Sequence, residues 1–351
     1  IPLLKQWYQR RVHGEGKPCP IYIYTQGRCG GQLRWREMEK SKSKVLVVGG
    51  TGYLGRRLVK ASLRHGHQTF VLHRPEIGVD VDKAQMLLSL KRRGARLVAG
   101  SLHDHRSLVA AVKLVDVVIS AISGVHFRSH HLLLQLRLVH AIADAGNITR
   151  FLPSEFGADP RRMKDAMEPG RVSFEEKMIV RDAIEKEGIP FTYISANCFA
   201  AYFLGGLCQL GTLFPSQTNV TLWGDGNQKA IYVDEDDIAT YTIKAIDDPR
   251  TLYKTLYLRP PENILSQREV VEIWEKLIGK ELKKDSISKE ELLASMEGEN
   301  FINQVGISHY YHFFYEGCLA NFEIGDGGVE ASTLYPEVQY TTVEDYLRRY
   351  L

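Results

Sequence analysis

The sequence lacks the cysteine patterns of zinc-binding and redox proteins. It contains only five cysteines, none in a CxxC pair and none beside a histidine pattern typical of zinc. An odd number of scattered cysteines favours reduced structural thiols, and neighbouring helical residues such as His130 and His131 do not converge on one ion. We therefore expect no metal site. The cysteines are Cys19, Cys29, Cys198, Cys208 and Cys318.

Long apolar runs and a broad basic surface are also missing. No run can span a bilayer, and the N-terminus has no apolar stretch of a secretory signal. The formal charge of +3 arises from residues 1–37, where seven Lys/Arg outnumber two Asp/Glu, so the rest of the chain sums to −2. We therefore expect a cytoplasmic protein that binds neither membranes nor nucleic acid.

Residues 1–37 show neither helical nor strand periodicity, and the first methionine of the sequence is Met38. We predict that residues 1–40 are a non-native or disordered extension, with Met38 as the natural start. A basic transit segment is the alternative, because arginine is common and glutamate scarce there, although serine is scarce too.

A regular alternation of strand and helix begins after Lys44. The apolar run Val45–Val48 is typical of a strand buried on both faces, and a helical pattern follows over 53–65. Strands separated by helices predict an α/β fold with a doubly wound parallel sheet of the Rossmann type. Further strands are expected near 69–72, 96–99, 115–122, 149–152 and 191–195.

The pattern changes beyond Asn197, where aromatic and glycine-rich stretches replace the alternation. Ser266-Gln-Arg-Glu269 fits a capping box that opens a helix through Ile278. We predict a Rossmann domain over 41–197 and a smaller α/β domain over 198–351.

A glycine-rich turn separates the first strand from the first helix. Small residues let the backbone approach a pyrophosphate, while the helix N-terminus offers unpaired N–H groups. This position in a strand–turn–helix unit favours dinucleotide binding over a simple turn. The turn residues are Gly49, Gly50, Thr51, Gly52, Tyr53, Leu54 and Gly55.

The residues after the second strand indicate which dinucleotide binds. An NAD-binding protein usually places an acid there, whereas this chain reads His73-Arg74-Pro75. The guanidinium of Arg74 matches a 2′-phosphate, and Lys83 would add a second positive charge. NADPH is therefore predicted as the cofactor, unless Arg74 and Lys83 are ordinary surface residues. The Rossmann domain over 41–197 would bind NADPH, and 198–351 would be the substrate-binding domain.

The helix expected after Pro169 carries the catalytic candidate. No tyrosine precedes a lysine by four positions anywhere in the chain, and Ser173 stands where that tyrosine would be. Lys177 and Arg181 share a helix face, and a desolvated lysine beside a second cation suits a general base. Both cations could instead form surface pairs with the acids of that helix, Glu175, Glu176, Asp182 and Glu185.

These motifs together resemble a plant family of atypical short-chain dehydrogenases: the isoflavone reductases, phenylcoumaran benzylic ether reductases and pinoresinol-lariciresinol reductases. The resemblance runs from about Lys42 to the C-terminus, and residues 122–130 and 203–208 look most like the last group. It is carried by residues 49–55, Leu-Pro-Ser-Glu-Phe-Gly at 152–157, the Lys177 helix, Ser-Ala-Asn-Cys-Phe at 195–199 and Gly-Asp-Gly-Asn-Gln-Lys at 224–229.

The resemblance implies NADPH-dependent opening of benzylic ether rings in lignans, from pinoresinol to lariciresinol and onward to secoisolariciresinol. It assigns Lys177 as the base that makes a quinone methide, Arg181 as a substrate-contacting or pKa-lowering neighbour, and Val125, Tyr202 and His309 as substrate contacts. For His309, packing in an aromatic cluster is the alternative. Cofactor contacts are implied for Ser120, Ser123, Pro153, Phe156, Lys177, Asn197 and Phe199.

Other functions stay open at this point. A related reductase of this family would act on a phenylcoumaran benzylic ether, an isoflavone or a leucoanthocyanidin, and a relative of another class would be a non-catalytic NADP-sensing regulator. Members of the family suggest a homodimer, although no residue pattern demonstrates an interface.

Overall fold

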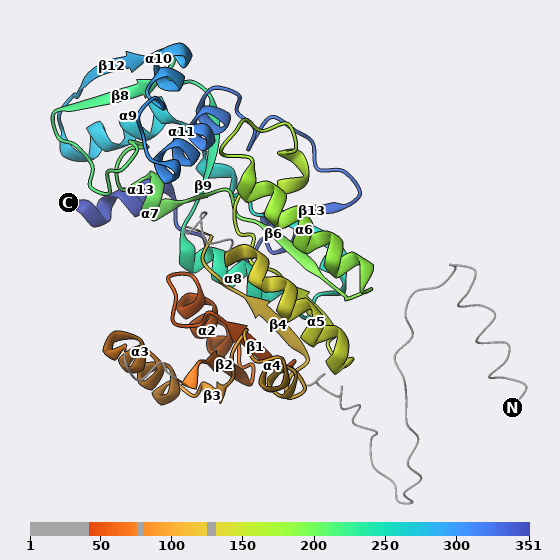
Figure 1. Cartoon of the computed structure of the whole chain (residues 1–351). Helices are drawn as coiled ribbons and strands as arrows, with labels where there is room; N and C mark the ends of the chain where they lie inside the picture. The colour runs from red at the N-terminus through yellow and green to blue at the C-terminus, as the bar shows by residue number, and fades with distance from the viewer. Residues whose placement is uncertain (1–41, 76–79, 125–130) are drawn as a thin grey trace, which may run out of the picture. The chain divides into compact units, whose positions relative to one another are not determined.

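Five parallel strands form the central sheet in the order β3-β2-β1-β4-β5 (Figure 1). The computed structural model describes residues 42–75, 80–124 and 131–351. The predicted extension 1–40 lies outside these residues. The strands are β1 Val45–Val48, β2 Thr69–His73, β3 Arg96–Ala99, β4 Val117–Ser120 and β5 Arg150–Leu152.

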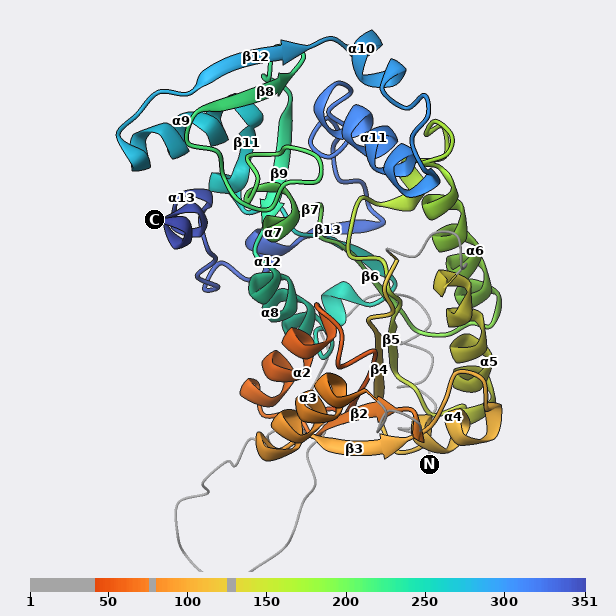
Figure 2. The same cartoon turned by 60° about the vertical axis from the view of Figure 1, so that its left-hand side comes forward.

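Alternate residues of the strands face two separate cores. Val45 and Val47 pack with one set of helices, whereas Leu46 and Val48 pack with the other. Figure 2 shows the sheet between the two helical layers. The first layer contains α2 Gly55–Arg64, α3 Val81–Arg92 and α8 Glu235–Ala245, and the second contains α4 His105–Val112, α5 Gln135–Ala145 and α6 Val172–Lys186. The predicted doubly wound α/β fold is thus confirmed.

Three more parallel strands continue this sheet. An isolated bridge between Phe151 and Phe191 links β5 to β6, which pairs with β10, which pairs with β13. The boundary proposed at Asn197 stays a prediction, and strands from both sides of it lie in this arrangement. The three are β6 Thr192–Ser195, β10 Lys254–Tyr257 and β13 Gly328–Glu330.

The remaining C-terminal elements surround a third core. Two small sheets, β11-β9-β7 and β12-β8, lie there. Their strands are β7 Cys198–Phe199, β8 Asn219–Trp223, β9 Lys229–Val233, β11 Ile264–Ser266 and β12 Lys283–Ile287. The α-helices of this core are α7 Ala200–Phe203, α9 Gln267–Ile278, α10 Lys289–Ala294, α11 Phe301–Phe314 and α13 Val343–Leu347. The short helix α12 Ala331–Leu334 packs instead in the first core, with Val45 and Val47.

The capping box predicted for α9 is present. The Ser266 side chain accepts from the Glu269 N–H, and the Glu269 carboxylate accepts from the Ser266 N–H. These bonds satisfy two backbone donors that the start of a helix leaves unpaired. The helix ends at Ile278, as predicted.

Short 3₁₀ helices connect several of these elements. Two of them, η3 His131–Leu134 and η4 Pro160–Arg162, lie beside the site described below. The others are η5 Pro249–Thr251, η6 Pro261–Asn263 and η7 Arg348–Tyr350.

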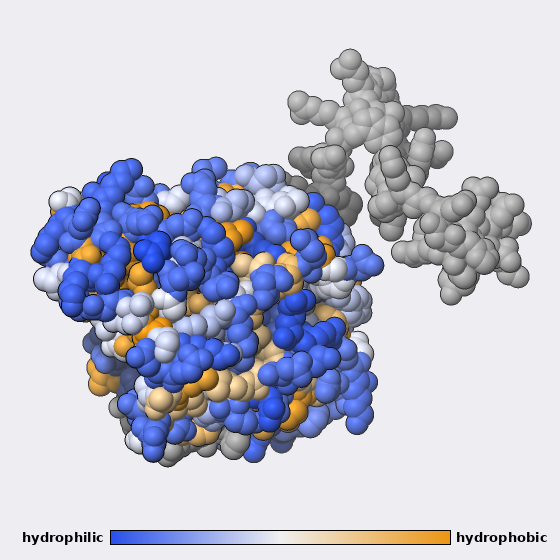
Figure 3. Space-filling model, turned by 90° about the horizontal axis from the view of Figure 1, so that it is seen from above, coloured by the Kyte–Doolittle hydropathy of each residue, from blue (hydrophilic) through white to orange (hydrophobic). Residues whose placement is uncertain are grey.

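The surface of the molecule is mainly polar on the face seen from above (Figure 3). Figure 3 shows a face that is mainly hydrophilic, with small hydrophobic areas between polar residues. Within the part of the chain that the structure describes, no helix is both long and apolar enough to cross a bilayer.

Candidate active site

The glycine turn lies between β1 and α2, as the sequence predicts. Gly49 has φ +84°, and a Cβ there would come within 2.5 Å of the Ala121 carbonyl oxygen. A Cβ on Gly55 would lie 2.1 Å from the Gly49 carbonyl oxygen, so both positions require glycine. No side chain caps α2, and its first turn contains no acid. The turn therefore presents backbone and uncapped N–H groups to an anion.

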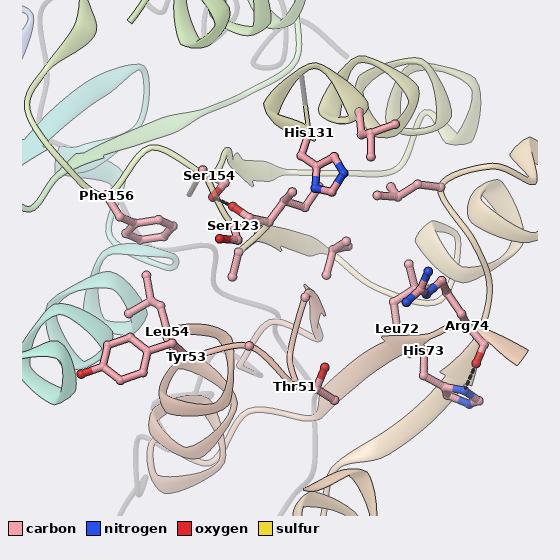
Figure 4. Close-up of a pocket in the computed structure, with 18 of the residues that line it drawn as sticks. Thr51, Tyr53, Leu54, Leu72, His73, Arg74, Ser123, His131, Ser154 and Phe156 are labelled. Carbon is pink, nitrogen blue, oxygen red and sulfur yellow. Dashed lines mark hydrogen bonds between the residues drawn. The ribbon is translucent and has the colours of Figure 1, made fainter. Parts of the chain in front are cut away.

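A groove of about 500 Å³ opens above this turn. In Figure 4, His73 and Arg74 lie at one end, Tyr53 and Phe156 at the other, and Thr51 between them. The groove thus follows the carboxyl ends of the strands, where α/β sheets bind their ligands. Predicted residues that line it are Gly49, Thr51, Gly52, Tyr53, Leu54, Arg74, Lys83, Ser123, Phe156, Phe199 and Tyr202.

The Arg74 end of the groove carries the two predicted cations in different states. The Arg74 side chain has no hydrogen bond or ion pair within the described residues, and its carbonyl lies 3.2 Å from His73 Nδ1. Lys83 Nζ lies 2.6 Å from Asp80 Oδ2, and the Lys83 N–H also bonds this carboxylate. Arg74 is therefore the better candidate for a 2′-phosphate.

A loop that sequence reasoning missed completes this end. Residues 100–103 line the groove. Arg137 of α5 holds the loop, with Nη1 3.0 Å from His103 Nδ1. Nothing in the local sequence indicates this support, because Arg137 lies 34 positions from His103 in the chain.

Aromatic rings form the other end of the groove. Tyr202, whose exposed fraction is 47%, lies 5.9 Å from the Tyr53 ring and 6.1 Å from the Phe199 ring, centroid to centroid. The Arg57 guanidinium lies 4.3 Å from the centre of the Tyr53 ring. Phe156 has φ +44°, a conformation that bulky residues rarely adopt. Such a wall suits a flat aromatic ligand.

Several predicted cofactor residues do not line the groove. Gly50 and Gly55 pack inside the turn, and the Ser120 hydroxyl is buried without a hydrogen-bond partner in the described chain. Pro153 is buried, and Asn197, with φ +56°, donates to the Leu258 carbonyl. These residues shape the strand ends beneath the groove. Direct cofactor contact by them stays a prediction, and Val125 lies outside the described residues.

Lys177 lies on α6, behind the loop that follows β5. A Cβ added to Gly157 would lie 3.6 Å from Lys177 Nζ, so this amine lies close to the backbone of the loop. Burial lowers the pKa of Lys177, Glu155 and Asp159 oppose this effect, and Arg181 adds to it. A lysine with a lowered pKa is more often in the neutral form, which can accept a proton.

Arg181 lies one turn further along α6 and is completely enclosed. Its Nε and Nη2 donate to the Glu155 carboxylate at 2.6 and 2.5 Å, and Nη1 lies 2.9 Å from Asp159 Oδ1. Burial alone would lower the pKa of Arg181, but these carboxylates raise it. The side chain is only 1% exposed, so neither the predicted substrate contact nor the alternative of a surface pair describes it.

His309, on α11, meets α6 at the serine that replaces the usual tyrosine. Its Nε2 lies 3.3 Å from Ser173 Oγ and 3.2 Å from the Gly170 carbonyl oxygen. The imidazole also lies 5.0 Å from the Phe174 ring, so it belongs to an aromatic cluster while facing the Lys177 side of α6. Burial lowers the pKa of His309 to about 4, and Lys177 contributes. This histidine is therefore neutral at pH 7.

The neutral state of His309 makes folding stability depend on pH. The unfolded chain protonates it near pH 6.5, whereas the folded chain resists until about pH 4. The contribution of His309 to folding stability is thus fully present above pH 6.5 and is lost as the pH drops toward 4. Through His309, the free energy of unfolding of the wild type should fall by about 2 to 3 kcal/mol over this interval. We expect this fall to be absent in His309→Gln.

Urea titrations of wild type and His309→Gln at a series of pH values measure this effect. His140→Gln, at an exposed position of α5, is the matched control and should retain the wild-type slope. Parallel slopes for all three proteins would contradict the prediction.

Sequence reasoning also missed the acids and the serine of the loop after β5. Ser154 donates to the Ile122 carbonyl and, with Glu155, lines the groove. The only available signal was the 152–157 motif itself, because the partners of these side chains lie far away in the chain. Asp159 gave no signal of its own.

No metal centre competes with this site in the described chain. The structure there holds no group of three or more His, Cys, Asp or Glu side chains able to bind a metal ion. Cys198, Cys208 and Cys318 are free thiols, and Cys19 and Cys29 lie outside the described residues.

Comparisons with known proteins agree with the groove and the motifs around it. The NmrA-like family matches residues 41–347. Bifunctional pinoresinol-lariciresinol reductase 2 of Linum usitatissimum is 70% identical over 310 residues, covering 88% of this chain and 94% of the relative. Bifunctional pinoresinol-lariciresinol reductase of Sinopodophyllum hexandrum is 70% identical over 311 residues, covering 89% of this chain and 100% of the relative.

A solved structure is similarly close. AtPrR2 with NADP+ and (+)pinoresinol aligns at a TM-score of 0.86 and 57% identity, covering 89% of this chain and 100% of that chain. The resemblance seen in the motifs is thereby confirmed. This chain belongs to the NmrA-like family and, within it, to the pinoresinol-lariciresinol reductase group.

Proposed function

We propose that this chain is an NADPH-dependent reductase that opens the furan rings of lignans, converting pinoresinol to lariciresinol and then to secoisolariciresinol. The observation that carries the proposal is the groove, which joins a dinucleotide turn to an aromatic end near Lys177. The relatives named for this reaction, and the one solved with NADP+ and (+)pinoresinol, support the same assignment.

The residues of the groove fit the cofactor. Gly49 and Gly52 would lie against the pyrophosphate at the start of α2, and Arg74 would pair with the 2′-phosphate. Phe156 and Phe199 would flank the nicotinamide. When bound, NADPH supplies the hydride that the benzylic carbon of the substrate accepts.

Lys177 would begin the reaction as a base. Its lowered pKa lets it take the proton of a substrate phenol that lies para to the benzylic ether carbon. The electrons of the phenolate would then break the bond between the benzylic carbon and the ether oxygen, which leaves a quinone methide and an alkoxide in the substrate. The proton held by Lys177 would pass to this alkoxide, and hydride addition to the benzylic carbon would restore the phenolate. This role requires a lysine rather than a tyrosine acid, which agrees with Ser173 in the tyrosine position.

Product analysis tests the substrate. Purified protein with NADPH should consume pinoresinol and release lariciresinol and secoisolariciresinol. A phenylcoumaran, an isoflavone and a leucoanthocyanidin serve as competing substrates. Consumption of one of these with pinoresinol unchanged would replace the proposed reaction by the corresponding one.

A non-catalytic NADP-sensing regulator is the alternative of another class. The lowered pKa of Lys177 beside the groove argues against it, because a sensor has no need of a base. NADPH binding without turnover of any of the four substrates would favour the regulator.

Arg74 should decide between the two nicotinamide cofactors. We expect Arg74→Ala to weaken NADPH binding about 10- to 100-fold, the range for losing hydrogen bonds to a charged group, while NADH binding changes little. Lys83→Ala is the matched control, and its effect should be smaller because Asp80 already holds this lysine. Fluorescence titrations with both cofactors measure the change. Equal losses for NADPH and NADH would show that Arg74 does not read the phosphate.

We further propose that the protein is a cytoplasmic homodimer. Family resemblance supports the dimer. Light scattering on purified protein and fractionation of cells test the two statements separately.

A further inference from the structure

A buried cluster of charges lies one helical turn from Lys177. It contains the carboxylates of Glu155 and Asp159 and the guanidinium of Arg181, whose side chains are 3%, 5% and 1% exposed. Two negative groups and one positive group leave a formal charge of −1. Such an excess is costly away from water unless a fourth group balances it.

Lys177 is the group placed to balance this charge. It precedes Arg181 by four residues and so lies on the same face of α6. Its Nζ lies above Gly157, in the loop that carries Glu155. No carboxylate of the described chain lies within 4.0 Å of this amine, so attraction acts on it without fixing it in an ion pair. Glu155 also lines the groove, which connects the cluster to the place of reaction.

The loop that carries the cluster is held firmly in place. The Gly157 carbonyl accepts from Ser195 Oγ at 3.1 Å and from the Asn197 N–H at 3.3 Å. The Tyr257 hydroxyl donates to Asp159 Oδ2 at 2.6 Å, and the Arg181 guanidinium lies 4.1 Å from the Tyr193 ring centre. These contacts fix the acids relative to α6, so their effect on Lys177 depends on charge and not on loop position.

We propose that Glu155, Asp159 and Arg181 are positioning residues whose single excess negative charge is neutralised by the proton that Lys177 accepts from the substrate. This inference rests on the proposed role of Lys177 as a base. Arg181 prevents the two acids from holding a proton on Lys177 permanently, and the acids stabilise that proton once the substrate has delivered it. The cluster thus keeps Lys177 between a permanently charged and a permanently neutral state.

Other titratable groups near Lys177 do not supply this balance. His309 faces it from α11 but is neutral at pH 7, since its pKa is about 4. His131 of η3 lines the groove and is not among the groups whose charge shifts the pKa of Lys177. The charged groups that act on Lys177 are therefore Glu155, Arg181 and Asp159.

Opposite changes of charge in the cluster should shift the pKa of Lys177 in opposite directions. Glu155→Gln removes a negative charge, so protonation of Lys177 should require a lower pH. Arg181→Met removes a positive charge, so Lys177 should stay protonated to a higher pH. The double variant restores the wild-type charge of the cluster and should titrate close to wild type. Glu175→Gln removes a solvent-facing acid of the same helix and should cause no shift.

Two measurements follow these shifts. NMR of ¹³C-methylated lysines reports the titration of Lys177 without substrate, with its signal identified by its loss in Lys177→Arg. The acid limb of kcat/KM for pinoresinol reports the same group of the free enzyme through its effect on activity. Circular dichroism shows which variants fold, and if Arg181→Met does not, Glu155→Gln compared with the double variant gives the answer.

Opposite shifts with recovery in the double variant would support the proposal. Shifts in the same direction, or none, would overturn it, because loss of structure alone has no sign. The two proposals fail separately. If pinoresinol is not consumed while the NMR shifts follow the charges, the proposed reaction is wrong and the charge balance stands. If pinoresinol is consumed and the shifts are absent, only the charge balance is wrong.

Discussion

Lys177→Met is expected to lower kcat for pinoresinol about 10²- to 10⁴-fold, the usual contribution of a general base, while NADPH binding stays close to wild type. Methionine keeps the length of the side chain and loses the amine that accepts the phenolic proton. Cofactor affinity should survive because Lys177 lies above Gly157 and not among the residues that line the groove. Single-turnover kinetics and a fluorescence titration with NADPH measure the two quantities.

Lys186→Met provides the control for this experiment. Lys186 lies in the last turn of the same helix and is exposed, so its loss should change neither kcat nor NADPH binding. Full turnover by Lys177→Met would remove lysine from the chemistry. Weakened NADPH binding would instead assign Lys177 a direct cofactor contact, as the family resemblance implies.

Local patterns in the sequence were sufficient to predict most of the Rossmann fold. The run Val45–Val48 is buried on both faces because each face of the sheet has its own helices, and a pattern without alternation reports this directly. The ends of strands are predicted less accurately: the sequence indicates a strand over 115–122, whereas β4 spans Val117–Ser120. The return of β10 and β13 to the same row of strands left no local signal, because parallel pairing joins distant segments.

The site was predictable only where chemistry follows from neighbouring residues. Glycines between a strand and a helix, and the four-residue spacing of Lys177 and Arg181, are such cases. The partners of Arg181 were not, since Glu155 is 26 positions away and the acids on its own helix were closer candidates. Burial determines which acids pair with Arg181: α6 turns Arg181 toward the loop after β5, whereas Glu175 of the same helix stays exposed.

Arg181→Met is expected to lower the free energy of unfolding by about 3 to 5 kcal/mol, the range for removing one partner of a buried ion pair. The loss would leave Glu155 and Asp159 enclosed without a positive partner, which is costly in a region with little water. Urea denaturation followed by circular dichroism measures it.

Arg161→Met is the matched comparison, because Arg161 pairs with Glu185 at 2.9 Å where both side chains are exposed, 57% and 42%. Water screens such a pair, so its loss should cost about 0 to 1 kcal/mol. Adding Glu155→Gln to Arg181→Met should recover part of the stability, since one of the two unbalanced acids is then neutral. Equal costs for Arg181→Met and Arg161→Met would mean that the enclosed pair adds no more to folding than a surface pair, and that the acids near Lys177 reach water in the folded protein.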